Sequence, residues 1–273
     1  MTDNKANDEH PVPRSEWPFQ EVLSDEHTRQ LETVEVYATT VEPRQTNVVL
    51  NISLEDLREI SQQNGLGDQI NPTVVSVPRY APRNRNQYEK WKHLWPMTFR
   101  EDTRQDPKFT HREIQAIQDH MRQLLALDKI CARIVNAAGD VIAEATDTRL
   151  ETEHPLHHAV INCIDTVAEK ERQAGRRKRK SSEVTRSPSD QEEKTVYLCT
   201  GYDIYITHEP CAMCAMALVH SRIGRVFYSR STPTGCLGTL HKIHSHPSLN
   251  HHYRVFKGVL AEPDGMDKEL LDA

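Results

Sequence analysis

The chain has 273 residues, of which 37% are hydrophobic, and a formal net charge of -6 at pH 7. This length suffices for one large domain or two smaller ones, and the acidic balance argues against a protein that coats nucleic acid with its whole surface, so an RNA contact needs a local basic patch. The six cysteines are too few for a disulfide scaffold, and no apolar run resembles a membrane span or a signal peptide. We therefore expect a soluble, intracellular protein without membrane contact.

The first half of the chain predicts an arm and a small domain. Residues 1–28 are polar and punctuated by proline, which indicates a disordered arm. An α+β domain is expected over residues 29–105, because VEVYAT alternates like a strand and NVVLNISLEDLREISQ has apolar residues at helical spacing.

Within this domain, VVSVPRYAPRNRNQYEKWKHLWPMTF interleaves aromatic residues with basic ones. The basic residues are Arg79, Arg83, Arg85, Lys90 and Lys92. Such a mixture can neutralise phosphates and stack on unpaired bases. A solvated loop that leads into a helix, with tryptophans packed on the core, explains the pattern equally well.

The second domain is expected over residues 106–273. It opens with the helical pattern HREIQAIQDHMRQLLALDK, followed by the hairpin pattern CARIVNAAGDVIAEATD and a helix over residues 155–171. Residues 172–196 predict a disordered insertion, whose run RRKRK fits a nuclear-import signal, an RNA contact or a solvated charge run. YDIYIT, RVFYS and YRVFKGVL then predict strands, and PCAMCAMALVHSRI a helix. Alternating strands and helices imply an α/β sheet covered by helices.

A cysteine pair and one histidine have the pattern of a zinc site. Cys211 and Cys214 stand three residues apart in the first turn of a helix that Pro210 introduces, where the helix dipole favours thiolates. His158 supplies a nitrogen ligand if the two helix starts lie side by side. Three protein ligands leave one tetrahedral position of Zn²⁺ free, as in hydrolytic sites. The alternative for the cysteines alone is a pair of small buried residues.

Zinc-dependent deaminases carry H-x-E followed by P-C-x-x-C, and the glutamate moves protons without binding the metal. Here the second half of the signature is intact, whereas the first half reads His158, Ala159, Val160. Deamination requires a group that takes up and delivers protons, which an isopropyl side chain cannot do. Of the nearby carboxylates, Glu209 directly precedes Pro210, and Glu153 lies outside the helix turn that would aim it at the metal. We therefore expect no catalytic residue, with Val160 at the position of the proton-shuttling glutamate.

With these residues in place, the sequence resembles the non-catalytic subunit of the eukaryotic heterodimeric tRNA adenosine deaminase, which makes inosine at wobble position 34. Valine in place of the glutamate is characteristic of that subunit. The resemblance covers most of residues 34–260 and is carried by LHHAVINCIDTVA, YLCTGYDIYITHEPCAMCAMALVHSRIGRVFY, GCLGTLHKIHSHPSLNHHYRVFKGVL, YATTVEPRQTNVVL and HLWPMTFRED.

The resemblance implies a cytidine-deaminase-like three-layer α/β/α core with a mixed sheet. It also implies that a preceding domain holds the body of the tRNA, which favours the RNA-binding interpretation of the basic stretch, and that the chain pairs with a catalytic subunit that keeps H-A-E. His158, Cys211 and Cys214 become zinc ligands. We expect a scaffold for the catalytic subunit, located in the cytoplasm and nucleus.

Two other functions remain open. One is an autonomous deaminase with an unconventional base, and the other is a zinc-stabilised RNA-binding adaptor without a deaminase partner. In addition, HKIHSHPSLNHH holds five histidines within twelve residues and can be read as a second metal cluster. The family that the chain resembles has a similar PxLNH stretch before its last strand, close to the subunit interface and the RNA.

Overall fold

The computed structural model describes residues 10–38, 73–100, 106–182 and 198–261, and it divides the chain into two compact units. The first unit comprises Met1–Asp25 and Asp106–Ala273, and the second comprises Glu26–Gln105. The boundary after residue 105 coincides with the predicted one, and the earlier boundary falls after residue 25, where the sequence predicted it after residue 28. The predicted helical pattern over residues 47–62 lies outside the described residues.

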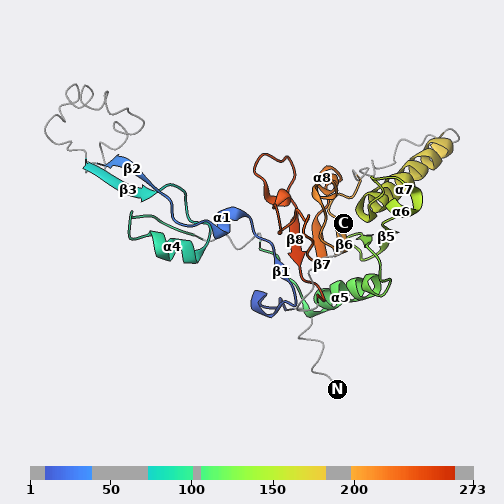
Figure 1. Cartoon of the computed structure of the whole chain (residues 1–273), viewed down its shortest axis with the longest axis horizontal. Coiled ribbons are helices and arrows are strands. Elements are labelled where there is room, and N and C mark those ends of the chain that lie inside the picture. The colour runs from blue at the N-terminus through green and yellow to red at the C-terminus, as the bar shows by residue number, and fades with distance from the viewer. Residues whose placement is uncertain (1–9, 39–72, 101–105, 183–197, 262–273) are drawn as a thin grey trace, which may run out of the picture. The chain divides into compact units, whose positions relative to one another are not determined.

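A six-stranded mixed sheet forms the centre of the first unit, with the strand order β1-β8-β7-β6-β4-β5 (Figure 1). Its strands are β1 (Gln20–Glu21), β4 (Cys131–Val135), β5 (Val141–Thr146), β6 (Asp203–His208), β7 (Arg225–Arg230) and β8 (Arg254–Lys257). The three strands β6, β7 and β8 are parallel, and the remaining pairs are antiparallel. The carboxyl ends of β6 and β7 therefore lie at the same edge of the sheet.

Helices cover both faces of this sheet. Helix α5 (His111–Leu125) packs on one face, and α7 (Ala159–Ser182) and α8 (Ala212–His220) pack on the other. Because side chains alternate along a strand, Ile204 and Ile206 join the core beneath α7 and α8, whereas Tyr205 joins the core beneath α5. The expected three-layer α/β/α core is confirmed. No helix in the described ranges is long and apolar enough to span a membrane.

The N-terminal segment belongs to the first unit. Val12 and Phe19 are buried, the Phe19 ring lies 5.3 Å edge-on from that of Phe109, and β1 pairs with β8. The prediction of a disordered arm over residues 1–28 is therefore wrong for residues 10–25, while residues 1–9 lie outside the described part. Burial of two large side chains here offsets the entropy cost that the polar, proline-rich composition suggested.

The helix predicted over residues 155–171 begins and ends later than expected. Helix α7 starts at Ala159, after the short α6 (Arg149–Thr152), and continues to Ser182. The predicted disordered insertion over residues 172–196 is therefore wrong for the backbone of residues 172–182, because a sequence rich in Arg and Lys can extend a helix that is already nucleated. Residues 183–197 lie outside the described ranges.

In the second unit, β2 (Thr33–Ala38) pairs antiparallel with β3 (Thr73–Pro78), and α4 (Arg85–Trp91) follows. Asn84 caps α4, with its side chain accepting a hydrogen bond of 2.8 Å from the backbone N–H of Gln87. The buried Gln87 side chain donates to the carbonyls of Glu26 and Arg29. The described part of this unit has the α+β character that the sequence predicted.

Candidate metal centre

His158 directly precedes the first residue of α7, and side-chain hydrogen bonds hold the loop before it in place. The Asn162 side chain donates to the carbonyls of Thr146 and His157 and to the Thr148 hydroxyl, at 2.9, 3.1 and 2.9 Å. The backbone N–H of Asn162 bonds to the His158 carbonyl at 3.0 Å. His158 is 7% exposed. Asn162, four residues along the helix, therefore orients this histidine, a role that the sequence analysis missed.

The two cysteines lie at the start of α8, directly beyond the carboxyl end of β6. Cys211 is the N-cap residue, with extended backbone angles, and Cys214 lies within the first helical turn and is buried. Pro210, directly before the N-cap residue, supports the end of the strand because it has no backbone N–H to donate to the sheet. Both sulfurs face the same side, as the spacing predicted.

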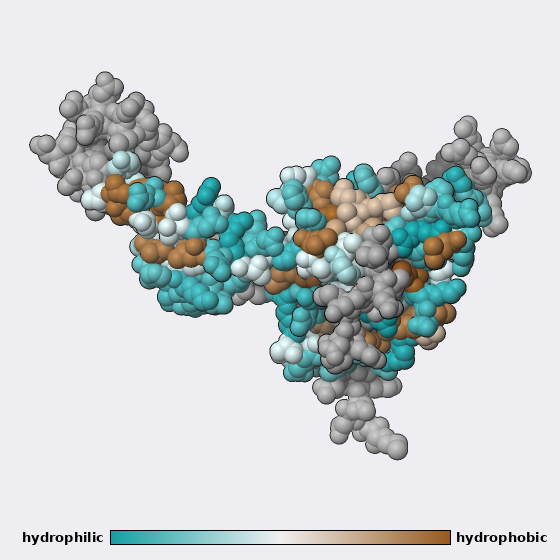
Figure 2. Space-filling view, in the orientation of Figure 1, coloured by the Kyte–Doolittle hydropathy of each residue, from teal (hydrophilic) through white to brown (hydrophobic). Residues whose placement is uncertain are grey.

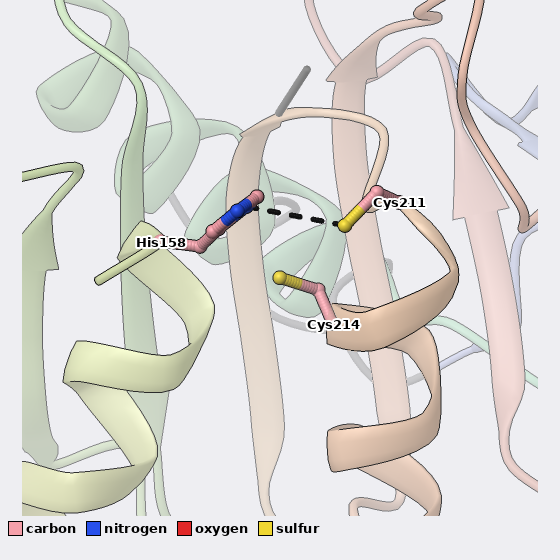
Figure 3. A group of neighbouring side chains, drawn as sticks. All are labelled: His158, Cys211 and Cys214. Carbon is pink, nitrogen blue, oxygen red and sulfur yellow. Dashed lines mark hydrogen bonds between the residues drawn. The ribbon is translucent and has the colours of Figure 1, made fainter. Parts of the chain in front are cut away.

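The three side chains converge across the starts of α7 and α8 (Figure 3). His158 Nδ1 lies 3.9 Å from Cys211 Sγ, and all three ligand atoms lie within 4.8 Å of one another. Ligands of a tetrahedral zinc ion are separated by about 3.5 Å, given bonds of about 2.0 Å to nitrogen and 2.3 Å to sulfur. One imidazole nitrogen and two sulfurs at this spacing fit zinc after a small inward adjustment of the side chains.

The hydrogen bond between the two cysteines shifts their pKa values in opposite directions. The hydrogen bond with the Cys214 thiol lowers the pKa of Cys211 to about 5, although burial opposes this effect. The same hydrogen bond raises the pKa of Cys214, and burial raises it further. Cys211 is therefore a thiolate near neutral pH, which is the form that binds metals.

The metal group contains no carboxylate. Val160 is 3% exposed and belongs to the apolar core that also includes Cys214 and Ala215. Glu153 is exposed and ends α6 in a left-handed conformation. Of the two carboxylates that the sequence singled out, only Glu209 is buried next to the metal-binding segment.

Glu209 is fully buried, and its carboxylate is already engaged. Oε1 accepts hydrogen bonds from the backbone N–H groups of Leu237 and Thr239 at 2.9 and 3.0 Å, and Oε2 accepts one from the Thr239 hydroxyl at 2.5 Å. These three donors direct both carboxylate oxygens at the loop segment 237–239. Glu209 therefore holds a loop in place, a function that only the fold reveals.

The histidine-rich segment does not form a second metal cluster in the described part of the chain, where His158, Cys211 and Cys214 are the only such group. Three of its five rings are instead directed at backbone carbonyls. His244 Nε2 lies 3.0 Å from the carbonyl of Val22, His251 Nε2 lies 2.7 Å from that of Ile223, and His252 Nε2 lies 2.9 Å from that of His246. These histidines tie the loop to neighbouring segments.

The basic residues that the sequence singled out as RNA contacts all lie in the second unit and are exposed. Arg79 pairs with Glu32 at 3.6 Å, Arg83 with Glu26 at 2.8 Å, and Arg85 with Glu89 at 2.9 Å. Lys92 also pairs with Glu89, and Lys90 lies in the last turn of α4. Nearby glutamates therefore balance much of this positive charge.

The aromatic residues among them divide into two groups. Trp91 is 3% exposed, so it packs in the unit's interior, and Tyr88 stacks on Phe99. Tyr80 and Trp95 are exposed, and the Arg29 guanidinium lies 3.8 Å above the Tyr80 ring. Trp91 therefore fits the interpretation of a tryptophan packed on the core, whereas Tyr80 and Trp95 are accessible side chains.

The fold and the site together define a deaminase-type zinc domain. The model of the cytidine and deoxycytidylate deaminase zinc-binding region matches residues 104–230, which include all three candidate ligands. The chain carries a zinc-binding region of this type.

Similar proteins from other organisms identify the family within the deaminases more closely. The chain is 36% identical over 273 residues to the probable inactive tRNA-specific adenosine deaminase-like protein 3 of Danio rerio, covering 92% of this chain and 80% of that protein. Identity to the Homo sapiens protein of the same name is 40% over 228 residues, covering 72% of this chain and 64% of the human protein's length. The tRNA-specific adenosine deaminase subunit tad3 of Schizosaccharomyces pombe is 28% identical over 297 residues, covering 90% of this chain and 91% of that protein. The chain belongs to the tRNA-specific adenosine deaminase-like protein 3 family.

We expect His244 to make the stability of the first unit depend on pH. Burial lowers the pKa of His244 from 6.5 to about 4. Between these values the unfolded chain binds a proton that the folded chain excludes, so stability falls as pH drops from about 6.5 to about 4. His244→Gln keeps an N–H donor for the Val22 carbonyl but cannot titrate. Urea unfolding at about pH 7 and about pH 5 should show a loss of stability that is smaller in His244→Gln by about 2 kcal/mol.

The matched control is His154→Gln, because His154 is exposed. It should retain the full pH dependence of the wild type. An equal loss of stability in wild type and His244→Gln would contradict the assignment.

Proposed function

We propose that this chain is the non-catalytic, zinc-binding subunit of a heterodimeric tRNA adenosine deaminase that converts adenosine to inosine at wobble position 34. The observation that carries the proposal is Val160, buried two residues after His158 where the deaminase signature has its proton-carrying glutamate. The engagement of Glu209 with a loop removes the nearest substitute. The names of the relatives, "probable inactive" in Danio rerio and "subunit" in Schizosaccharomyces pombe, agree with this role.

In this proposal His158, Cys211 and Cys214 bind Zn²⁺, which supplies folding free energy at this site. The ligands belong to the starts of α7 and α8, so the ion would link these two helix starts directly. The three residues keep both helix starts at the carboxyl edge of β6. In the proposed heterodimer, this chain therefore contributes a rigid surface around the carboxyl end of β6.

Helix α8 offers a surface for the catalytic partner. Ala212 and Met216 are exposed, and Met213 and Ala217 are half-buried on the same helix. These residues form an apolar patch on the first unit (Figure 2). Exposed apolar helix faces in water-soluble domains mark interaction sites. We propose that the H-A-E-bearing subunit packs here, and that the basic residues of the second unit bind the body of the tRNA.

The first expected outcome concerns the metal. Cys214→Ala should abolish the zinc that the wild-type chain carries at about one ion per chain, and it should lower the melting temperature by about 5 °C or more, because a ligand of a folding-coupled metal is lost. Metal content is measured by mass spectrometry on the purified chain. Cys163→Ala is the matched control, since Cys163 is equally buried but lies outside the metal group and bonds to the Ala132 carbonyl. Retention of zinc in Cys214→Ala would refute the ligand assignment.

The second outcome concerns activity. Inosine at position 34 of a full-length tRNA is measured with this chain alone, with a catalytic H-A-E subunit alone, and with both. We expect activity in the mixture and none from this chain alone, and Val160→Ala should leave the activity of the mixture unchanged, because the valine carries no proton. Inosine formation by this chain alone would instead support an autonomous deaminase.

The third outcome concerns RNA. Glu89 pairs with both Arg85 and Lys92, so Glu89→Gln should release two cations and strengthen tRNA binding by the heterodimer a few-fold. Arg85→Gln should weaken binding and reduce the salt slope by about one. Fluorescence anisotropy over a series of KCl concentrations tests both. Glu151→Gln, which makes the same charge change in the first unit, is the control. Unchanged affinity in both second-unit variants would contradict the assignment.

A further inference from the structure

Glu209 anchors one end of a long loop that follows β7. Besides the three bonds to its carboxylate, its backbone N–H donates to the Arg230 carbonyl at 2.8 Å, and its carbonyl accepts from the Thr232 hydroxyl at 3.1 Å. The next residue, Pro210, accepts a hydrogen bond of 2.9 Å from the Cys236 N–H. The loop over residues 232–245, which we call the anchor loop, is thus fixed to the segment that carries Cys211.

The packing around this carboxylate leaves no spare room. A Cβ atom at Gly235 would lie 2.2 Å from Glu209 Cδ, so the loop backbone lies directly against the carboxyl group. Leu240 N–H bonds to the Gly235 carbonyl, and Ile243 N–H bonds to the Cys236 carbonyl, at 2.8 and 3.1 Å. These bonds connect the Glu209 end of the loop to the short helix η3 (Ile243–Ser245).

The other end of the anchor loop holds the N-terminal segment. His244 is 3% exposed, and because its pKa is lowered to about 4, its neutral ring donates Nε2–H to the Val22 carbonyl at 3.0 Å. A Cβ at Gly238 would lie 3.4 Å from Val22 Cγ1, so the loop also touches this side chain. Lys242 pairs with Asp25 at 2.7 Å. Asp25 is the last residue before the chain enters the second unit.

We propose that Glu209 is a positioning residue: through the anchor loop, its buried carboxylate fixes residues 22–25, and with them the place on the first unit from which the second unit is tethered. The carboxylate that an active-site search would choose as a replacement base thus serves to hold the tether. In the context of the function proposed above, it affects how tightly tRNA is held and leaves the chemical step unaffected.

The direct test is amide hydrogen exchange on the full chain with three variants. Glu209→Gln replaces the carboxylate with a neutral amide, whose NH₂ group cannot accept hydrogen bonds from Leu237 or Thr239. Thr239→Val keeps the side-chain shape but removes the hydroxyl donor, and Thr239→Ser retains that donor. We expect exchange over residues 22–25 and 232–245 to be about tenfold faster in Glu209→Gln, as expected for loss of hydrogen bonds to a charged group, less so in Thr239→Val, and unchanged in Thr239→Ser.

Zinc content should equal that of the wild type in all three variants, which separates this role from metal ligation. Faster exchange confined to residues 237–239, with residues 22–25 unchanged in both Glu209→Gln and Thr239→Val, overturns the proposal. Thr239→Val decides the question on its own if Glu209→Gln does not fold.

A kinetic measurement on the heterodimer distinguishes positioning from a general structural role. Glu209→Gln and Thr239→Val should raise KM for full-length tRNA about three- to tenfold with kcat unchanged. Thr239→Ser should have the KM of the wild type. A fall in kcat with KM unchanged would overturn the positioning role. If the wild-type pair makes no inosine, the proposed function fails, whereas the exchange measurement still decides the role of Glu209.

Discussion

The arrangement of the first unit depends on the edge of the sheet at which β6 ends. The chain leaves β6 at His208, becomes a helix at Ala212, and in between presents Glu209 to one loop and Cys211 to His158. Within four residues the backbone therefore serves two neighbours, the start of α7 and the anchor loop. Parallel strands bring loop and helix ends together at their carboxyl edge, so a small displacement there would disturb both neighbours at once.

Val160 provides no proton-transfer group at this edge of the sheet, but its side chain still fills the space there. The side chain is part of a continuous apolar core with Cys163 and Cys214. A carboxylate at this position would need water or a substrate beside it, whereas a buried valine is satisfied by packing alone. The described side chains around the three candidate ligands therefore include no acid-base group that has to be kept accessible to a substrate.

The sequence predicted the elements whose signals are local. Proline before the cysteine pair, apolar periodicity over residues 111–125 and the strand predicted for YDIYIT all match the structure. It failed where the partner lies far along the chain. Nothing around Glu209 indicates that its three donors stand 28 and 30 residues later. Likewise, Phe19 sits in a polar stretch, and only the fold supplies Phe109 and Phe256 for it to pack against.

The glutamates beside the basic residues of the second unit give that surface an internal set of counter-ions. An anionic ligand that binds there has to displace Glu26, Glu32 or Glu89 from the basic side chains. Exposed ion pairs of this kind contribute little free energy, so this displacement costs little. An isolated anion merely replaces one carboxylate with another. A sugar-phosphate backbone presents a row of charges that engages several released cations together. On the proposal that this surface binds tRNA, it would favour ligands of high charge density over proteins that carry scattered single charges.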